Sequence, residues 1–406
     1  MTNHVRHTFS SSTNKTAPIS NGKMITSSPP CLKCFHSFIA ISRSALRSNI
    51  ETIRSKIGPK TKLAIPVKSN AYGHGVREVV SGIDDLVDRY LIDDSRELFE
   101  LRTMTKKPIE LLGYVSPAEL DVVVEAKGVL SLFDEDHARS CLSWALERGE
   151  VLKAFLAIDL QFGREGISPA DAPVVIQYLR QSKGIELLGI YGHFSCADED
   201  PDLSISLAQQ KLLSSVIEAA HCQDLECHLF ASSGLWRFDT LNPYQRVIRP
   251  GLSVYGMWPS PSVKAHAEQQ GYHLRPCLSW HSTLAQVKKI PADFPIGYGG
   301  TFRSKRPMML GLIPQGYGDG LPRTYQKGGY VLIDGIRRPI LGRISMNMAV
   351  VDLSDLGIPS SGADVVLIGS QGSEMITPED HAVITDTIPY EVTTRISPIL
   401  PRVLVD

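Results

Sequence analysis

Short apolar runs recur along the first two thirds of the chain, separated by stretches with helical periodicity. Eight of these runs fit short strands: Leu63–Val67, Tyr90–Ile92, Ile109–Tyr114, Leu130–Phe133, Ala154–Ile158, Leu187–Phe194, His228–Ala231 and Val247–Ile248. Between them, stretches such as Arg96–Thr103 and Leu207–Ala220 carry an apolar residue at every third or fourth position, as amphipathic helices require. Because strands that alternate with helices pair in parallel, this pattern favours a closed (β/α)8 barrel, with an open doubly wound sheet as the alternative.

The pattern changes after about Pro259. Helical periodicity fades, and short β-rich runs such as Met309–Ile313, Tyr330–Ile333 and Val365–Ile368 alternate with Gly, Pro and Asp turns. We therefore expect an α/β chain with a (β/α)8 barrel over residues 35–262 and a mostly β C-terminal domain over residues 263–406. The first strand of the 35–262 region can join the β-domain.

Residues 1–34 differ from both regions. Residues 1–30 contain eleven Ser or Thr, three basic residues and no carboxylate. This composition, without apolar periodicity, predicts a disordered N-terminal extension. An acid-poor, Ser-rich organellar transit peptide is the alternative.

Overall composition excludes several classes of protein. The chain has 42 basic and 43 acidic residues, so it offers no net attraction to nucleic acid or anionic membranes. No apolar run approaches the roughly 20 residues that span a bilayer. Seven cysteines, an odd number, do not suggest a disulfide framework, and Cys31-Leu-Lys-Cys34 lacks a second metal-binding pair. We expect a cytoplasmic protein that binds no nucleic acid, membrane or metal.

The segment from Ala64 to Gly75, Ala-Ile-Pro-Val-Lys-Ser-Asn-Ala-Tyr-Gly-His-Gly, suggests chemistry. An apolar strand delivers Lys68 to its carboxyl end, which is where a barrel holds its active site. Apolar walls disfavour the ammonium form, so the neutral amine needed for Schiff-base chemistry becomes accessible. A lysine that packs its stem and extends its head into water is the alternative.

Other predicted strands end in polar groups at comparable places. Arg164 follows the fifth strand, His193 ends the sixth, Ser233 follows the seventh, and Arg249-Pro-Gly251-Leu252 follows the eighth. Ser233 and the amides of Gly251 and Leu252 could cradle a phosphate, as recurs after strands seven and eight of barrels. Each group alone is more often structural, but their convergence at one rim favours a site.

Six motifs resemble those of alanine racemase, a fold-type III pyridoxal-phosphate (PLP) family. They are Lys68-Ser-Asn-Ala-Tyr72-Gly-His-Gly, Gly192-His193-Phe194, Val247-Ile-Arg249-Pro-Gly251, Gly297-Tyr298-Gly299, Gly316-Tyr317-Gly-Asp-Gly and Pro339-Ile-Leu-Gly-Arg343-Ile-Ser-Met346. The resemblance runs from about Phe38 to Pro401. It implies that L- and D-alanine are interconverted to supply D-alanine for peptidoglycan. It also implies a head-to-tail homodimer whose active sites each combine one barrel with the partner's β-domain.

Carried over position by position, the resemblance assigns a role to each motif. Lys68 would hold PLP as a Schiff base and act as one catalytic base, while Tyr298, entering from the partner subunit, would act as the other. The phosphate would be bound by Tyr72, Ser233, Gly251, Leu252 and Tyr390.

The resemblance also assigns roles around the ring and the substrate. His193 would lie beside the ring and steer Tyr298, and Arg249 would contact the pyridine nitrogen. Arg164 and the Met346 backbone would bind the substrate carboxylate, while Tyr317 and Arg343 would line the entrance.

Racemisation explains why these residue types are needed. A proton must leave one face of a planar carbanion and another must arrive on the opposite face, so each face needs a base. A nearby guanidinium stabilises a phenolate, and Arg164 is the candidate beside Tyr298. Arginine at the pyridine nitrogen scarcely gives up its proton, so the ring stays unprotonated and side reactions such as transamination are discouraged.

The sequence departs from the family pattern around the substrate pocket. Ala157 stands where many members have a carbamylated lysine that orients the arginine, so we expect another group, such as Asp159, to hold Arg164. Met346-Asn347-Met348 replaces the usual Met-Asp-Gln, and the segment before Pro401 lacks the customary Tyr-Arg.

These departures leave other functions open. At Ala157 and Asn347 the sequence resembles the broad-spectrum amino-acid racemases, so a broad-spectrum racemase is the first alternative. A non-catalytic PLP-binding barrel protein is a second alternative, disfavoured by Gly297-Tyr298-Gly299 in a β-domain that such proteins usually lack. A fold-type III decarboxylase is disfavoured because Arg249, rather than a carboxylate, follows the eighth strand.

Overall fold

The computed structural model describes residues 35–354 and 357–406, so the extension predicted over residues 1–34 lies outside the described residues. Eight parallel strands form a barrel: β2 (Lys62–Pro66), β3 (Arg89–Ile92), β4 (Ile109–Leu111), β5 (Gly128–Leu132), β6 (Leu152–Ala157), β7 (Ile185–Tyr191), β8 (Glu226–His228) and β9 (Val247–Ile248). They pair in the order β8-β7-β6-β5-β4-β3-β2-β9. Every run predicted as a barrel strand overlaps one of these strands, although the predicted run His228–Ala231 shares only His228 with β8. The barrel is confirmed over the open sheet.

The barrel closes between β8 and β9 through single contacts rather than a continuous ladder. Isolated parallel bridges join Cys227 to Gln245 and Ala231 to Arg249. The Gln245 side chain also accepts a hydrogen bond from the Leu229 N–H at 3.1 Å.

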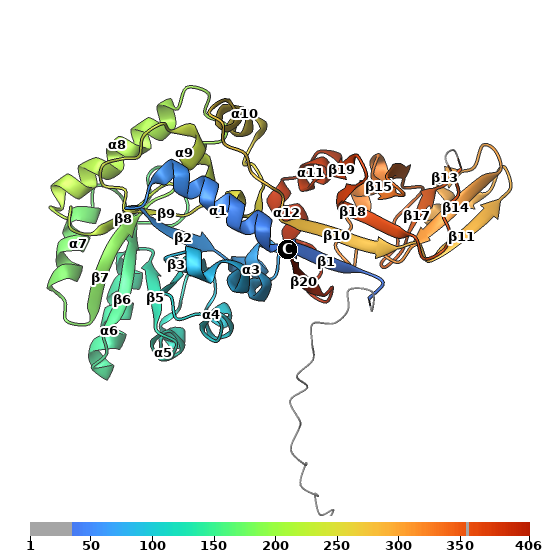
Figure 1. Cartoon of the computed structure of the whole chain (residues 1–406). Coiled ribbons are helices and arrows are strands. Elements are labelled where there is room, and N and C mark those ends of the chain that lie inside the picture. Colours follow the sequence, from blue (N-terminus) through green and yellow to red (C-terminus); the bar gives the residue numbers. More distant parts are fainter. Residues whose placement is uncertain (1–34, 355–356) are drawn as a thin grey trace, which may run out of the picture. The chain divides into compact units, whose positions relative to one another are not determined.

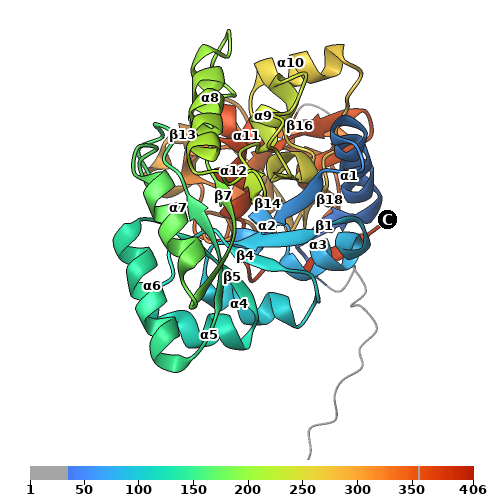
Figure 2. The ribbon, with the colours of Figure 1, turned by 90° about the vertical axis from the view of Figure 1, so that its left-hand side faces the viewer.

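Helices surround the barrel strands (Figures 1 and 2). They are α1 (Arg43–Ile57), α3 (Val76–Ile83), α4 (Ser95–Arg102), α5 (Leu120–Glu125), α6 (Glu135–Arg148), α7 (Ala172–Gln181), α8 (Ser204–Ala219) and α9 (Ser232–Arg237). Side-chain caps fix several starts: Ser42 accepts from the Ala45 N–H at 3.1 Å, and Asp134 accepts from the His137 N–H at 2.7 Å. Within residues 35–354 and 357–406, no helix is long and apolar enough to cross a membrane.

The C-terminal region is mostly β, as expected. Its main sheet has the order β16-β15-β18-β10-β1-β20, with β19 on β18, and a second sheet has the order β11-β14-β17. The strands are β1 (Phe38–Ser42), β10 (Leu278–Thr283), β11 (Gln286–Ile290), β12 (Pro295–Ile296), β13 (Phe302–Arg303), β14 (Met308–Ile313), β15 (Tyr330–Ile333), β16 (Ile336–Pro339), β17 (Ala349–Asp352), β18 (Asp364–Gln371), β19 (Glu374–Ile376) and β20 (Arg402–Val405). Asp334 and Gly335 turn β15 into β16 with φ of +56° and +72°, as a tight hairpin requires.

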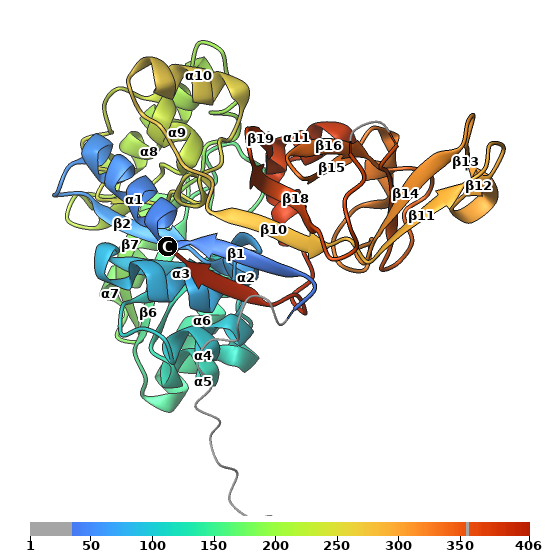
Figure 3. The same cartoon turned by 45° about the vertical axis from the view of Figure 1, so that its right-hand side comes forward.

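Three further features concern the N-terminal strand, the predicted domain boundary and the C-terminal helices. The N-terminal strand β1 pairs antiparallel with β10 and parallel with β20 (Figure 3). Helix α10 (Pro261–Gln269) packs on α9, so the boundary predicted between residues 262 and 263 falls inside a helix. Two helices near the C-terminus, α11 (Pro378–Thr385) and α12 (Pro389–Thr394), complete the region.

Candidate active site

A cavity of about 710 Å³ opens at the carboxyl ends of the barrel strands. Nine of the thirteen residues that the sequence singles out line it: Lys68, Tyr72, Arg164, His193, Ser233, Arg249, Gly251, Leu252 and Tyr390. Other lining residues were missed by the sequence analysis, among them Asp93, Tyr114, Phe133, Phe162 and Glu165. Each follows or lies near the end of a barrel strand, so strand-end position was the signal that could have found them.

Lys68 begins a turn with an unusual backbone. In α2 (Lys68–Tyr72), the four residues Ser69 to Tyr72 have φ between +53° and +55°. The left-handed conformation costs L-residues other than glycine roughly 1–2 kcal/mol each. Strain of this kind persists only where surrounding structure enforces it, and it concentrates at functional sites.

The end of the chain holds this strained turn in place. A Cβ at Gly73 would lie 1.9 Å from the Thr393 carbonyl oxygen, so only glycine permits this approach to α12. The Arg402 guanidinium donates to the Gly73 carbonyl at 3.2 and 3.1 Å. The same α12 carries Tyr390, whose ring centroid lies 5.9 Å from that of Tyr72. The C-terminal region thus completes the wall of the cavity beside Lys68.

Asp93 faces the Lys68 amine. Lys68 Nζ donates to Asp93 Oδ1 at 2.8 Å. The Glu97 carboxylate accepts from the backbone N–H groups of Ser69 at 2.7 Å and Asp93 at 3.1 Å, which ties the two loops together. The side chains of Lys68 and Asp93 are 36% and 52% exposed, so the pair orients the amine more than it stabilises the fold.

Tyr72, Gly251 and Tyr390 form a small cradle suited to an anion. A Cβ at Gly251 would lie 2.7 Å from Tyr72 Oη, so glycine keeps the backbone open there. Leu252 begins a short 3-10 helix, Leu252–Tyr255, and its own N–H has no helical acceptor, whereas the Ser253 N–H already donates to Ser232 Oγ at 3.2 Å. Burial raises the pKa of Tyr72 to about 12 and raises the pKa of Tyr390 further, so both hydroxyls remain donors at neutral pH. These donors, with Ser233, fit a phosphate group.

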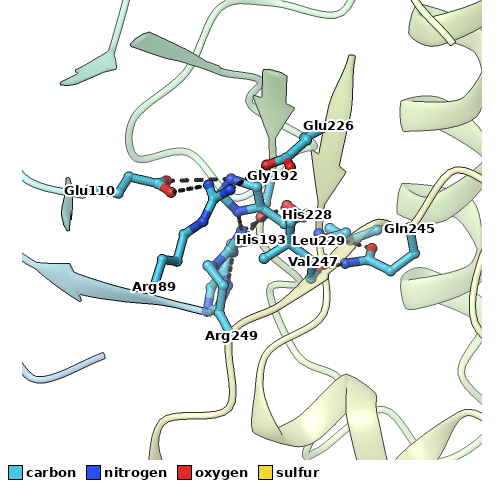
Figure 4. A network of polar contacts seen from close by, with 10 residues as sticks. All are labelled: Arg89, Glu110, Gly192, His193, Glu226, His228, Leu229, Gln245, Val247 and Arg249. Atoms are coloured by element: carbon cyan, nitrogen blue, oxygen red, sulfur yellow. Dashed lines mark hydrogen bonds and ion pairs between the residues drawn. The ribbon is translucent and has the colours of Figure 1, made fainter. Parts of the chain in front are cut away.

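Arg249 lines the cavity and is clamped by polar contacts with its neighbours (Figure 4). It is only 5% exposed. Nη1 contacts the carbonyl oxygen of His228 at 2.7 Å and also His228 Nδ1, while Nη2 donates to the Gly192 carbonyl at 2.7 Å and lies 3.4 Å from His193 Nδ1. None of these contacts uses Nε. The clamped guanidinium therefore keeps one donor for an acceptor such as a pyridine nitrogen, and the cavity residues fit PLP.

His193 stays neutral in this setting. Burial, with Arg249 and Arg164 nearby, lowers its pKa to about 3. A neutral imidazole can accept a hydrogen bond on one nitrogen and donate on the other. His193 also packs against Phe162, with ring centroids 5.7 Å apart.

The expectation that Asp159 holds Arg164 is wrong. Asp159 Oδ1 instead accepts from the backbone N–H groups of Phe162 at 2.8 Å and Gly163 at 3.1 Å, so it shapes the loop. The Arg164 guanidinium pairs with Glu165 through Nε and through Nη2, the latter at 2.9 Å, and lies 4.5 Å from the centre of the Phe162 ring. An acidic neighbour in the next position was the available signal.

The other four predicted residues lie on the β-domain and do not line the cavity. Tyr298, in the short helix Tyr298–Gly300, is 65% exposed, Met346 is 58% and Tyr317 is 46% exposed. A Cβ at Gly299 would lie 3.2 Å from Arg343 Nη1, and the Gly318 N–H donates to the Met346 carbonyl at 2.7 Å. We call Tyr298, Tyr317, Arg343 and Met346 the β-domain face. Within one chain, neither Lys68 nor Arg164 shares the cavity with Tyr298.

Comparisons with known proteins agree with this geometry. The family described as "Alanine racemase, N-terminal domain" matches residues 41–259, and "Alanine racemase, C-terminal domain" matches residues 277–404. An alanine racemase of Leptospira interrogans is 32% identical over 92% of this chain and 96% of its own length.

Solved structures show the same architecture. An alanine racemase of Clostridium difficile 630 superposes with a TM-score of 0.85 at 26% identity, covering 91% of this chain and 96% of its own. The alanine racemase of Bartonella henselae, with covalently bound pyridoxal phosphate, gives a TM-score of 0.80 at 24% identity over 91% of this chain and 100% of its own. The two domain matches, and the 32% identity that extends over nearly the full length of both chains, show that this chain belongs to the alanine racemase family of isomerases.

Proposed function

We propose that this amino-acid racemase interconverts L-alanine and D-alanine, using PLP in the barrel cavity and one base on each face of the substrate. The observation that carries the proposal is the convergence of Lys68, a phosphate-sized cradle and the clamped Arg249 in one cavity. We further propose that the enzyme is cytoplasmic and supplies D-alanine for peptidoglycan.

Different cavity residues would bind different parts of the cofactor. Lys68 would hold its aldehyde carbon covalently, and the Arg249 Nε–H would meet its ring nitrogen. Its phosphate would be bound by Tyr72, Ser233, Gly251, Leu252 and Tyr390. When bound, PLP supplies an electron sink that makes the Cα proton of an attached amino acid removable.

Arg164 and the two bases would handle the substrate. The Arg164 guanidinium would receive the carboxylate of the amino acid and fix Cα between the bases. Lys68 Nζ would take or give the proton on one face of Cα, and the phenol oxygen of Tyr298 would do so on the other. In each turnover one base gains the proton that leaves Cα and the other base gives a proton to Cα. The enzyme therefore ends the turnover in the protonation state that suits the opposite enantiomer.

The position of Tyr298 supports a site shared between two chains. Since Tyr298 is exposed and does not line its own cavity, we propose a head-to-tail homodimer in which the β-domain face of each subunit covers the other subunit's cavity. Tyr317 and Arg343 would then line the entrance, and the Met346 backbone would help to bind the substrate carboxylate.

Borohydride trapping tests the proposal. We expect purified protein to be yellow, to racemise L- and D-alanine, and after borohydride reduction to carry the cofactor on Lys68 in peptide maps. Lys68→Ala, which removes the amine, should remain unlabelled. Label on another lysine, or a colourless protein that does not respond to added PLP, would contradict the assignment.

A further inference from the structure

A row of buried ionisable side chains continues from Arg249 into the barrel (Figure 4). His228 Nε2 lies 3.4 Å from Glu110 Oε1, and Glu110 Oε2 accepts from Arg89 Nη1 at 3.2 Å. His228 and Glu110 are 0% exposed. Burying ionisable groups at this depth is unfavourable unless they are paired, so a core needed only for packing would be apolar here.

The contact with Arg249 fixes which nitrogen of His228 carries the proton. A guanidinium is only a donor, so Nδ1, which faces Arg249 Nη1, must accept. Burial, with Arg249 and Arg89 nearby, holds the pKa of His228 well below its usual range, so the ring is neutral. Its single proton therefore lies on Nε2.

Glu110 is the group placed to accept that proton. In the described part of the chain, His228 Nε2 and Glu110 Oε1 are both buried without a hydrogen-bond partner, and they face each other. If Glu110 pointed an O–H at Nε2 instead, the His228 proton would move to Nδ1, opposite the Arg249 donors. Burial raises the pKa of Glu110 to about 7, with Arg89 and Arg249 acting against this shift, so the carboxylate predominates at mildly alkaline pH.

We propose that Glu110 is a positioning residue which, through His228, holds the Arg249 guanidinium so that its Nε–H faces the ring nitrogen of the cofactor. The part that concerns the cofactor rests on the proposed function. Glu226 provides a matched control, because its carboxylate pairs with Arg89 and Lys62 rather than with His228.

Nitrogen-15 NMR of histidine-labelled holoenzyme at mildly alkaline pH tests the proposal. His228→Gln assigns the His228 signals. In the wild type and in Glu226→Gln, we expect a neutral His228 with its proton on Nε2. In Glu110→Leu, which lacks an acceptor, we expect loss of this single tautomer. Glu110→Gln retains an acceptor oxygen and should restore it.

The catalytic readout should follow the same order. We expect kcat/KM for alanine to fall by roughly 10- to 100-fold in Glu110→Leu, since a remote change that misplaces a group by about 1 Å can cost this much, and to recover most of that loss in Glu110→Gln. With PLP labelled at the pyridine nitrogen, the ring nitrogen should shift toward its protonated form in Glu110→Leu only.

Several outcomes would overturn the proposal. One is a proton on Nδ1 of His228 in the wild type, which needs no variant and so does not depend on whether Glu110→Leu folds. Others are an unchanged tautomer in Glu110→Leu, or an equal change in Glu226→Gln. The tautomer of His228 is read from the protein alone, whereas failure to bind PLP would refute the proposed function, so the two failures are distinguishable.

Discussion

The barrel cavity and the β-domain face present opposite kinds of surface. In the cavity, Arg249 is 5% exposed and its guanidinium makes polar contacts with His228, Gly192 and His193, and Tyr72 is packed between Gly251 and Tyr390. On the β-domain face, Tyr298 is 65% and Met346 58% exposed. Large exposed apolar and aromatic side chains gathered on one surface mark an interaction site. On the proposed function, one chain would supply the buried part of the site and carry on an exposed surface the residues that complete the partner's site.

This difference has a physical reason. Groups that anchor a cofactor must be held to within a fraction of an ångström, which requires packing and hydrogen bonds from the same chain. The strained turn after Lys68, held by Arg402 and closed against Thr393, is an example. A residue that acts on another subunit must instead stay accessible until the subunits meet.

The largest expected effect is the loss of activity when the barrel cavity and the β-domain face are each changed by one substitution. Lys68→Ala and Tyr298→Ala should each lower kcat by about 10²- to 10⁴-fold, the range typical of a lost acid-base group. After subunit exchange, an equal mixture should recover about a quarter of wild-type activity, since half of the dimers are heterodimers with one intact site.

A control mixture sharpens this result. Lys68→Ala mixed with Arg249→Glu should recover nothing, because both changes fall in the barrel half and no heterodimer has an intact cavity. If the first mixture stays inactive despite demonstrated heterodimers, Tyr298 acts in its own chain and the comparison between the two halves fails.

Substrate choice should show a smaller effect. Aromatic side chains already wall the cavity at Tyr114, Phe133 and Phe162, and Tyr317 would narrow the entrance from the β-domain face. We expect the highest kcat/KM for L- and D-alanine, a lower value for serine, and values at least about 100-fold lower for lysine and arginine, about 2.7 kcal/mol in transition-state binding. Comparable kcat/KM for lysine would identify a broad-spectrum racemase.

Loss of the partner of Arg164 should have a modest effect. Glu165→Gln removes the charge that pairs with Arg164. We expect KM for alanine to rise about three- to fivefold with little change in kcat, because solvent reaches the Arg164 side chain, which is 58% exposed, although Glu165 is only 16% exposed. Glu186→Gln breaks a pair with Lys153 away from the cavity and is the control. Equal KM values in both variants would show that Glu165 does not position Arg164.

The smallest expected effect is on folding stability. Met346→Lys should change the free energy of unfolding of the isolated chain by no more than about 0.5 kcal/mol, as is usual for an exposed position. It should nevertheless weaken the dimer in sedimentation experiments, whereas Val174→Lys, at a position of α7 that is 73% exposed, should not. A dimer unaffected by Met346→Lys would remove the β-domain face from the interface.

The sequence by itself determined the architecture and much of the cavity. Alternating apolar runs and amphipathic stretches depend on periods of two and 3.6 residues, which local sequence records, so all eight barrel strands were predictable. Once strand ends were known, Lys68, His193 and Arg249 had to meet, because parallel strands in a barrel end at one rim. The hairpin at Asp334-Gly335 was equally local.

Only the tertiary structure decided which groups are paired within that rim. Asp93 rather than an apolar wall faces Lys68, Glu165 rather than Asp159 holds Arg164, and Glu110 meets His228. These pairs join strand ends and loops whose side-chain directions depend on the packing of the whole barrel, and no local period encodes them. Sequence fixes which side chains arrive at the rim, whereas distances of a few ångströms between segments far apart in the chain fix which of them bond.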